Sequence, residues 1–338
     1  FTTKILPPIN NGFNKVHNYF KSFNVIIQAH NIKLKHNNIQ NFFKHNDCNL
    51  LLMSEANIEY CSESFIKAVH ASGVKVVILP YTFCTPQEPA KYYKTSFLHN
   101  IAENDKAFYN KKWIYHYEGQ TMIRMPKDAI QVIEEIKISP PNPWIQESST
   151  AEYIIAESQK IKEHYLKHGL PASQIEVLGD INQDILYTCV ANKSLLREKI
   201  YAELNLKITK NIFVFAVMPD YTKIYSDVCE FVDYNQMLRY VCDRLALIPD
   251  SSLLLSIHPS LNIDDYKYLE SDRIRISPRP VAELIAIADL YVACISATIK
   301  WAISIGLPVI NYDVYKFRYG DYLKVPGVLN IETKQEFE

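Results

Sequence analysis

The sequence predicts an α/β protein made of two Rossmann-like domains, each built on a parallel β-sheet. Short apolar runs alternate with helical patterns along the chain, and this alternation is typical of parallel strands joined by crossover helices. It is clearest within 253–313, where the apolar runs are 253–257, 289–295 and 308–310. With 338 residues, the chain is long enough for two domains that each have their own core.

Composition excludes several functional classes. Apolar residues make up 48% of the chain and charged residues 22%, as in a soluble globular protein. A net charge of −1 provides no basic field for nucleic acid. The longest apolar region, 281–310, is interrupted by charged residues, so we do not expect it to span a membrane. The seven cysteines contain no C-x-x-C pair, which favours free thiols in a reducing compartment.

The first domain is expected to cover 1–190. Its start is weakly patterned, with a candidate strand at 24–29. The elements expected after it are, in chain order, a strand at 50–53, a helix ending at 70, strands at 74–79 and 113–117, a helix near 128–136, a strand at 153–156, a helix at 158–168 and a strand at 175–178. Ser158 and Gly169 are the candidate caps of the last helix.

The second domain is expected to cover 191–338. A charged amphipathic helix at 192–206 is interpreted as the connection between the domains. The elements expected after it are a strand at 212–218, a helix at roughly 227–247, strands at 253–257 and 289–295, a helix at 299–305 and a short strand at 308–310. The tail, 311–338, is rich in tyrosine and has no clear period, so we expect it to be a loop region.

Polar side chains follow two strands of the second domain. His258 ends one strand, and Ser296 and Thr298 stand where the next strand gives way to a helix. Ligands of parallel α/β sheets gather at the carboxyl ends of the strands. Hydroxyls and backbone N–H groups at a helix start bind phosphate, and an imidazole can donate to a phosphate or to a leaving group. The alternatives are a helix cap and a structural histidine, but the coincidence of both features favours a phosphate site.

The first domain offers two acids on loops at the corresponding edge of its sheet. Glu55 follows the strand at 50–53, and Glu88 lies in the loop after the strand at 74–79. Either could serve as a general base toward an incoming hydroxyl. Most carboxylates on loops are simply solvated, and that reading stays open for both.

Several sharper motifs are missing. The chain has no G-x-G-x-x-G, P-loop, G-x-S-x-G or H-E-x-x-H sequence. His164 and His168 lie four apart on a predicted helix, but without a third ligand a surface pair fits better than a metal site. We therefore expect neither a metal nor a cofactor.

Three passages resemble the two-domain glycosyltransferase fold called GT-B, in which two Rossmann-like domains face each other across a cleft. YIIAESQKIKEHYLKHGLPASQIEVLGDINQDIL (153–186) resembles the end of the first domain in the UDP-N-acetylglucosamine 2-epimerase-like group. SIHPS (256–260) is similar to the His-Pro motif that contacts the donor phosphate in sialyl- and Kdo-type transferases, which implies nucleotide contacts for His258, Pro259 and Ser260. ADLYVACISATIKWAISIGLPVINYD (288–313) resembles the family's strand, phosphate-binding helix and Gly-x-Pro-Val turn.

Departures from the family pattern favour transfer over epimerisation. The epimerases carry Ser-Gly-Gly at the helix start, where this chain has Ser296-Ala297-Thr298. Their acid after the second strand is replaced by Pro80-Tyr81, and only Glu88 might match a later acid. The Glu-x7-Glu motif of many retaining GT-B enzymes is also missing. The pattern is more similar to the inverting enzymes that use CMP-sugars.

The resemblance therefore implies an inverting, metal-independent glycosyltransferase that builds bacterial surface polysaccharide, such as capsule or lipopolysaccharide. The expected partners are a nucleotide-sugar donor, CMP-linked (Kdo-like or sialic-acid-like) before UDP-linked, and a glycan or lipid-linked glycan acceptor. The expected location is the cytoplasm, with peripheral contact at the inner face of the membrane. Two alternatives stay open: a sugar-nucleotide epimerase of the same fold, and a non-catalytic glycan-binding module. The sequence begins with Phe1, so we also expect a segment of a longer protein.

Overall fold

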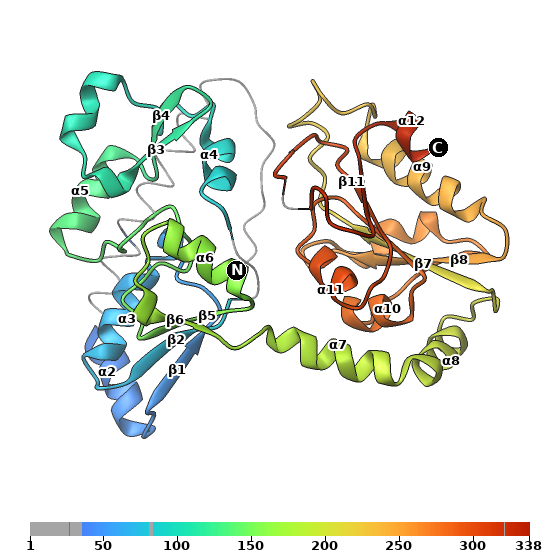
Figure 1. The fold of residues 1–338 in the computed structure, drawn as a ribbon, viewed down its shortest axis with the longest axis horizontal. Helices are drawn as coiled ribbons and strands as arrows, with labels where there is room; N and C mark the ends of the chain where they lie inside the picture. Colours follow the sequence, from blue (N-terminus) through green and yellow to red (C-terminus); the bar gives the residue numbers. More distant parts are fainter. Residues whose placement is uncertain (1–26, 28–35, 81–83, 321) are drawn as a thin grey trace. The chain divides into compact units, whose positions relative to one another are not determined.

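A computed structural model describes residues 27, 36–80, 84–320 and 322–338 (Figure 1). The chain divides into two compact units, Phe1–Asp180 and Ile181–Glu338, called unit 1 and unit 2 below. Each unit contains a parallel sheet between helices, which confirms the α/β class. The predicted strand at 24–29 lies outside the described residues, apart from Ile27, whose backbone is helical.

Unit 1 is built on a four-stranded parallel sheet in the order β1-β2-β5-β6. Its elements are α2 (His36–His45), β1 (Leu50–Met53), α3 (Ser62–His70), β2 (Lys75–Ile78), α4 (Gln87–Tyr93), β3 (Ile114–Tyr117), β4 (Gln120–Ile123), α5 (Lys127–Glu135), β5 (Tyr153–Ala156), α6 (Gln159–Lys167) and β6 (Ile175–Val177). The strands β1 and β2 are in register from Leu50↔Lys75 to Met53↔Ile78, so both end at one edge of the sheet. The loop that carries Glu55 therefore begins at the edge where β2 also ends, as predicted. Glu88 was expected in a loop, but it lies in the first turn of α4.

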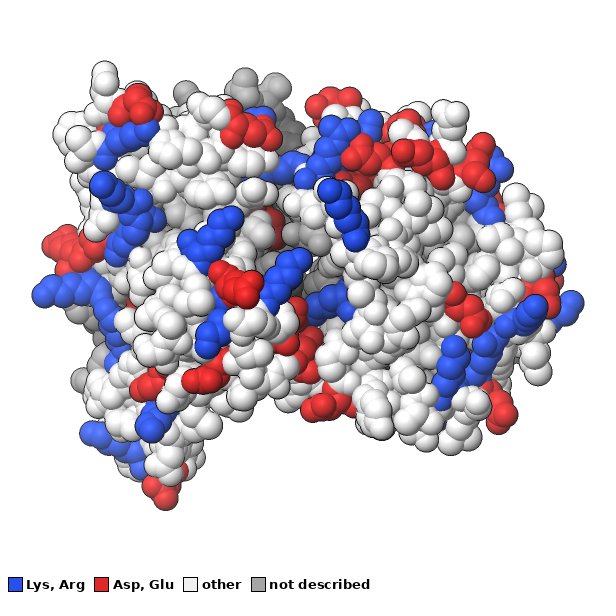
Figure 2. Space-filling model, in the orientation of Figure 1, with Lys and Arg blue, Asp and Glu red and all other residues white. Residues whose placement is uncertain are grey.

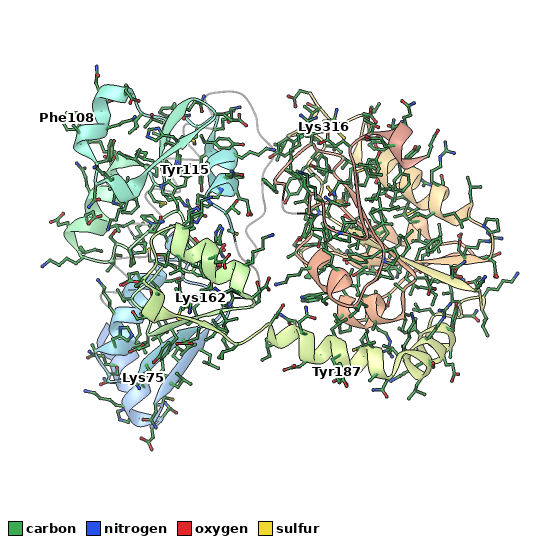
Figure 3. The ribbon with its side chains drawn as sticks, viewed as in Figure 1. Lys75, Phe108, Tyr115, Lys162, Tyr187 and Lys316 are labelled. Carbon is green, nitrogen blue, oxygen red and sulfur yellow. The ribbon has the colours of Figure 1, made fainter. Side chains whose placement is uncertain are left out.

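Local sequence signals explain where the elements of unit 1 end. The side chain of Ser158 accepts a hydrogen bond from the Ile161 N–H at 3.3 Å, so it caps α6 as predicted. Gly169 follows the helix with a φ of +83°, a conformation that costs glycine little. Lys162 of α6, labelled in Figure 3, donates to the Ile175 carbonyl at 2.9 Å and ties the helix to β6.

Unit 2 is a six-stranded, fully parallel sheet in the order β12-β11-β10-β7-β8-β9. Its elements are α7 (Ile181–Ala191), α8 (Lys193–Glu203), β7 (Asn211–Val217), α9 (Tyr234–Ala246), β8 (Ser251–Ile257), β9 (Ile274–Ile276), α10 (Val281–Ile287), β10 (Leu290–Ala293), α11 (Ile299–Ser304), β11 (Val309–Tyr312), β12 (Val328–Ile331) and α12 (Lys334–Phe337). The chain runs outward from β7 to β9 and then returns to the other side of β7. The order therefore reverses between β7 and β10, the point where doubly wound sheets bind ligands.

Alternate residues of the central strand enter two different cores. Phe213 and Phe215 of β7 face the core that α9 covers, whereas Ile212 and Val214 face the core beneath α10 and α11. This alternation follows from the two-residue period of a strand. Because both faces are covered, the strands are apolar almost throughout, as the sequence indicated.

Two predictions for unit 2 need correction. The tail was expected to be a loop, but β12 pairs with β11 and α12 follows it. A capping box holds the start of α12, in which Thr333 and Glu336 bond each other's backbone N–H, and this T-x-x-E spacing is visible in the sequence. The long helix was expected from about 227, but it begins at Tyr234, because the Asp233 side chain caps it by accepting the Gln236 N–H at 2.8 Å.

Among the helices of the described residues, none combines the length and the apolar character that crossing a bilayer requires. All seven cysteines are free thiols.

Candidate functional site

His258 lies directly after β8, at the carboxyl edge of the unit 2 sheet. Its backbone N–H donates to the Val217 carbonyl at 3.1 Å, which continues the pairing of β8 with β7 by one residue. The imidazole is exposed, as are Pro259 and Ser260. The strand ending and the turn after it therefore present the ring at the surface rather than in the core.

Ser260 fixes the tautomer of the His258 ring. Its backbone N–H and its hydroxyl both lie against Nδ1, at 3.2 and 2.8 Å. Because Nδ1 accepts the backbone N–H, the hydrogen of a neutral ring sits on Nε2. Partial desolvation lowers the pKa of the ring even though its rim is exposed, which favours this neutral form. The outward Nε2–H is thus a ready hydrogen-bond donor.

Ser296 and Thr298 form a tight turn between β10 and α11. The Ser296 hydroxyl oxygen accepts the Thr298 N–H at 3.3 Å, and the Ser296 carbonyl accepts the Ile299 N–H at 3.0 Å. The helix that follows has six residues. Since these two backbone N–H groups are already bonded inside the turn, anion binding here would depend on the hydroxyls.

A strained residue shapes this turn. Ile295 has a φ of +43°, which is unfavourable for a β-branched side chain. The Asn311 side chain, almost fully buried, accepts the Ile295 N–H at 2.9 Å and donates to the Asn330 amide oxygen at 2.9 Å. The Tyr322 hydroxyl donates to the Ser296 carbonyl at 3.1 Å. These bonds hold the backbone in a conformation that it would otherwise leave.

The strand order brings His258 and Ser296 to the same edge. Strand β7 lies between β8 and β10, so the two residues follow strands that are about 10 Å apart, two inter-strand spacings. An anion above the end of β7 would lie within reach of both side chains. The hydroxyls of Ser296 and Thr298 are bonded to each other, and both are bonded to the buried Tyr291 hydroxyl.

The two predicted acids of unit 1 are both held by neighbours. The Gln146 side chain donates to the Glu55 carboxylate, and the Gln146 carbonyl accepts the Ala56 N–H at 3.1 Å. Glu88, in the first turn of α4, accepts the Thr85 N–H at 2.9 Å, just before the helix begins. Both side chains are half-buried. Their carboxylates are therefore oriented rather than freely solvated.

A third acid, Glu147, was missed by the sequence reasoning. Its side chain is 1% exposed, and within the described residues its Oε2 has no hydrogen-bond partner. Burial raises the pKa of this carboxyl to about 8, with smaller contributions from the charges of Glu55 and Glu88, while its own backbone amide acts in the opposite direction. Glu147 follows Gln146, the residue that orients Glu55. The three carboxyls thus form one electrostatically coupled group, called the acid cluster below.

Two further groups, the half-buried Cys84 and the buried Tyr165, lie within electrostatic reach of the acid cluster. Burial raises the pKa of the Cys84 thiol, and the charges of Glu88, Glu147 and Glu55 add to the effect. Burial also raises the pKa of the Tyr165 phenol, with a contribution from Glu147. The Tyr165 hydroxyl has no hydrogen-bond partner among the described residues. Groups with perturbed pKa values therefore gather beside the acid cluster, as they often do at functional sites.

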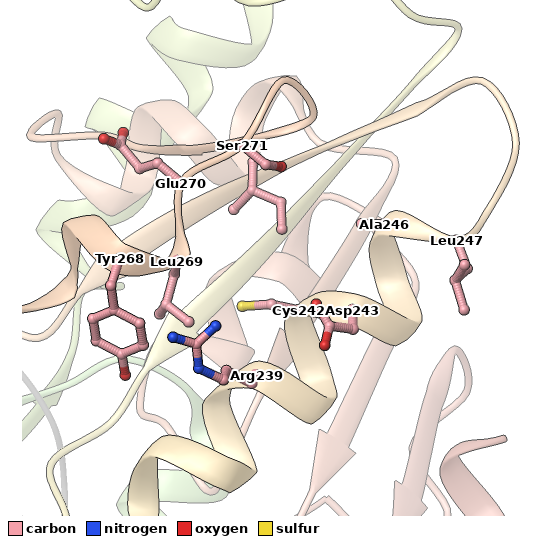
Figure 4. A pocket seen from close by; sticks show the side chains of 10 residues that line it. Arg239, Cys242, Asp243, Ala246, Leu247, Tyr268, Leu269, Glu270 and Ser271 are labelled. Carbon is pink, nitrogen blue, oxygen red and sulfur yellow. The ribbon is translucent and has the colours of Figure 1, made fainter.

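Other features of the described residues do not form a competing site. No group of three or more His, Cys, Asp or Glu side chains there is arranged to hold a metal ion. On the face shown in Figure 2, basic and acidic side chains are interspersed on each unit. A surface pocket between α9 and the segment leading into β9 is lined by residues that include Arg239, Tyr268 and Ile274 (Figure 4). Its lining residues precede β8 or β9 or stand at the start of β9, whereas His258 follows the end of β8.

No protein-family model and no curated protein matches the sequence. Among solved structures, the chain is similar to the wall teichoic acid polymerase TagF, with 18% identity over 75% of this chain and 52% of that chain, and a TM-score of 0.42. It is similar to the UDP-GlcNAc 2-epimerase of Methanocaldococcus jannaschii, with 12% identity over 90% of this chain and 72% of that chain, and a TM-score of 0.48. It is also similar to S. aureus MnaA in a structure with UDP, with 11% identity over 84% of this chain and 63% of that chain, and a TM-score of 0.45. The chain thus spans about half the length of TagF. These structures include UDP-GlcNAc 2-epimerases, the group to which the sequence resemblance pointed.

Proposed function

We propose that the protein is an inverting glycosyltransferase that takes a sugar from a nucleotide donor. The observation that carries the proposal is the placement of His258 and Ser296 at the carboxyl edge of a doubly wound sheet, on either side of the end of β7. The switch point of such a sheet binds nucleotides in many unrelated proteins. A CMP-linked donor, Kdo-like or sialic-acid-like, remains our first choice, with UDP-linked sugars next.

Unit 2 would hold the donor's phosphate and stabilise the leaving group. As the bond between the anomeric carbon and the phosphate oxygen breaks, the electron pair and the negative charge stay on the nucleotide. The Nε2–H of His258 and the Ser296 hydroxyl can donate to that oxygen, with Ser260 holding the ring in place. Donors fixed before the reaction stabilise developing charge without reorganisation.

Unit 1 would supply the base. The acceptor hydroxyl attacks the anomeric carbon from the face opposite the phosphate, and its proton passes to a carboxylate. With a pKa of about 8, Glu147 carries a proton at neutral pH and is a poor base there. Glu55 or Glu88 takes that role, and the protonated Glu147 can donate a hydrogen bond beside it.

The acceptor in this proposal is a glycan or a lipid-linked glycan of a bacterial surface polysaccharide. Work on such an acceptor takes place at the inner face of the membrane, so peripheral membrane contact belongs to the same proposal. Metal ions have no role in it.

The test is transfer by the full chain from CMP-sialic acid, CMP-Kdo or UDP-N-acetylglucosamine to a panel of oligosaccharide acceptors, with the anomeric configuration of the product read by NMR. We expect an inverted product from a CMP-linked donor. Replacing His258 with Ala should lower kcat/KM about 100- to 1000-fold. His45→Ala, at an exposed histidine of α2, is the matched control and should leave the rate unchanged.

Two results would contradict the proposal. If UDP-N-acetylglucosamine is converted without any acceptor, the epimerase alternative is correct. If His258→Ala transfers sugar as fast as the unaltered chain, His258 does not take part in the reaction, and a non-catalytic role of this edge becomes the better account.

A further inference from the structure

One face of the unit 1 sheet carries apolar side chains that lie in no core. Successive residues of a strand point to opposite faces of a sheet, so the register of the strands shows which residues share a face. Leu52, Val77 and Tyr153 are aligned across three strands, and Leu50 and Ile155 point to the same side two residues away. None of these five belongs to a hydrophobic core of the described residues, and Leu50, Leu52 and Tyr153 are 52%, 54% and 42% exposed. They are called the open face below.

The strand order explains why helices cover only the other face. That face packs against α2, α3 and α6, which contribute Phe43, Ile66 and Tyr165 to the same core. The order β1-β2-β5-β6 follows the chain without a reversal (Figure 1). Because connections between parallel strands are right-handed, successive crossovers in one direction lie on one side of the sheet. The sheet of unit 2 has a reversal and is covered on both faces, whereas among the described residues that of unit 1 is covered on one.

The open face has one positive and one negative charge at diagonally opposite corners. Lys75 of β2 stands two residues before Val77, and Glu176 of β6 is aligned with Ile155, two residues after Tyr153. Both side chains are exposed, and neither forms an ion pair within the described residues (Lys75 is labelled in Figure 3). Strand β5 lies between β2 and β6, and Tyr153 is aligned with Val77. Tyr153 therefore stands midway between the two charges.

An apolar face with opposite charges at opposite corners is complementary to itself. Parallel sheets occur almost only with both faces covered, and exposed apolar patches mark interaction sites. We propose that the open face binds the open face of a second copy of this chain, in a two-fold symmetric dimer. This inference goes beyond the proposed function and does not depend on it.

Symmetry determines which charges meet in this dimer. In a two-fold dimer, any contact of one residue with a second residue of the partner occurs twice, with the roles exchanged. The axis runs between the two sheets, through the midpoint of the line from Lys75 to Glu176 and at a right angle to that line. It places Lys75 of each copy opposite Glu176 of the other. The two Tyr153 rings then meet at the axis, where an aromatic pair buries a large apolar area.

The open face is small, so the dimer should be weak. The strands of this sheet have three or four residues each, and neighbouring strands lie about 4.8 Å apart. Interfaces that bury less than about 1,200 Å² in total belong mostly to weak, transient complexes. We expect a dissociation constant of about 1–100 μM, so the dimer should dissociate on dilution.

Sedimentation equilibrium of the full chain at about 1 to 200 μM covers this range. Lys75→Glu and Glu176→Lys should each weaken the dimer about 5- to 50-fold, because each turns two attractive charge pairs into repulsive ones. An equimolar mixture of these two variants should dimerise about as tightly as the unaltered chain, since the mixed dimer restores both opposite-charge pairs. This recovery is specific to reciprocal pairing of Lys75 with Glu176.

Tyr153→Asp should abolish the dimer, because it brings two carboxylates together at the axis. Tyr187→Asp is the matched control: Tyr187 is 75% exposed on α7 of unit 2 (Figure 3), and its replacement should leave the dimer unchanged. Circular dichroism checks the fold of each variant. The inference is wrong if the unaltered chain stays monomeric throughout the range, in which case something else covers the open face. It is also wrong if Tyr153→Asp still dimerises, or if the mixed charge variants stay as weak as either alone.

Discussion

The carboxyl of Glu147 combines burial with two neighbouring like charges. Both effects disfavour the ionised form, and together they raise its pKa from 4.5 to about 8. The proton that it keeps at neutral pH gives the acid cluster a hydrogen-bond donor among acceptors. If a carboxyl of unit 1 serves as the base, as we propose, the raised pKa of Glu147 favours Glu55 or Glu88 for that role.

The free energy of unfolding should depend on pH because of this proton. Between pH 4.5 and about 8 the folded Glu147 holds a proton that the unfolded chain releases, so stability falls as the pH rises through this interval. The loss is on the order of 5 kcal/mol. Glu147→Gln should abolish this part of the pH dependence. Compared with the unaltered chain, the variant should gain more stability at pH 9 than at pH 5. Urea unfolding from pH 5 to 9, followed by circular dichroism, measures it.

The matched control is Glu176→Gln, at an exposed carboxylate of β6, which should keep the original pH slope. Equal slopes for Glu147→Gln and the unaltered chain would show that Glu147 titrates in the folded protein as it does in the unfolded one.

The turn between β10 and α11 depends on support from the neighbouring strand. Asn311 of β11 accepts the N–H of Ile295, whose φ is +43°, and donates to Asn330 of β12. Side chains of β11 and β12 thus support the turn after β10 that carries Ser296. Strained backbone of this kind persists only where its surroundings determine it.

Asn311→Ala should lower the free energy of unfolding by about 1–3 kcal/mol, because it leaves buried polar groups without partners. Asn262→Ala is the control: this exposed amide caps a short helical turn through a 3.4 Å bond, and its loss should cost less than about 0.5 kcal/mol. Chemical unfolding of both variants gives the comparison. A smaller loss for Asn311→Ala than for Asn262→Ala would mean that the buried amide does not hold the turn.

At the scale of elements, the sequence was informative wherever local pattern decides the outcome. The strands at 50–53 and 153–156 have the predicted bounds, because short apolar runs between polar turns have few alternatives. Strand β12 and the first residue of α9 were not predicted. The four residues of β12 become a strand through pairing with β11, and the start of α9 depends on the Asp233 cap.

The candidate site could be predicted only in part, for a similar reason. The strand-end rule found His258, Ser296 and the loop acids, since parallel strands bring their carboxyl ends together. Glu147 follows no strand, and its burial comes from contacts of residues far apart in the sequence. The Thr298 hydroxyl likewise points inward because it is bonded to the hydroxyl of Tyr291. In the sequence pattern, Tyr291 looks like an ordinary core residue of a strand.

For the whole molecule, we propose that unit 2 binds the nucleotide and that the acid cluster of unit 1 takes the proton of the acceptor. Each unit has a core of its own, so each can hold its part of the chemistry in place. The sequence resemblance likewise implied that one Rossmann-like domain binds the donor and the other lies on the acceptor side. The central claim is that the edge of unit 2 binds a nucleotide through its phosphate.

Titration calorimetry of the full chain with CMP, CDP, UDP and GDP, repeated with His258→Ala, tests that claim most directly. We predict that at least one cytidine or uridine nucleotide binds in a 1:1 complex, and that His258→Ala weakens it about 10-fold or more through loss of a hydrogen bond to a charged group. Absence of binding by all four nucleotides, or equal affinity in the His258→Ala variant, would contradict the account.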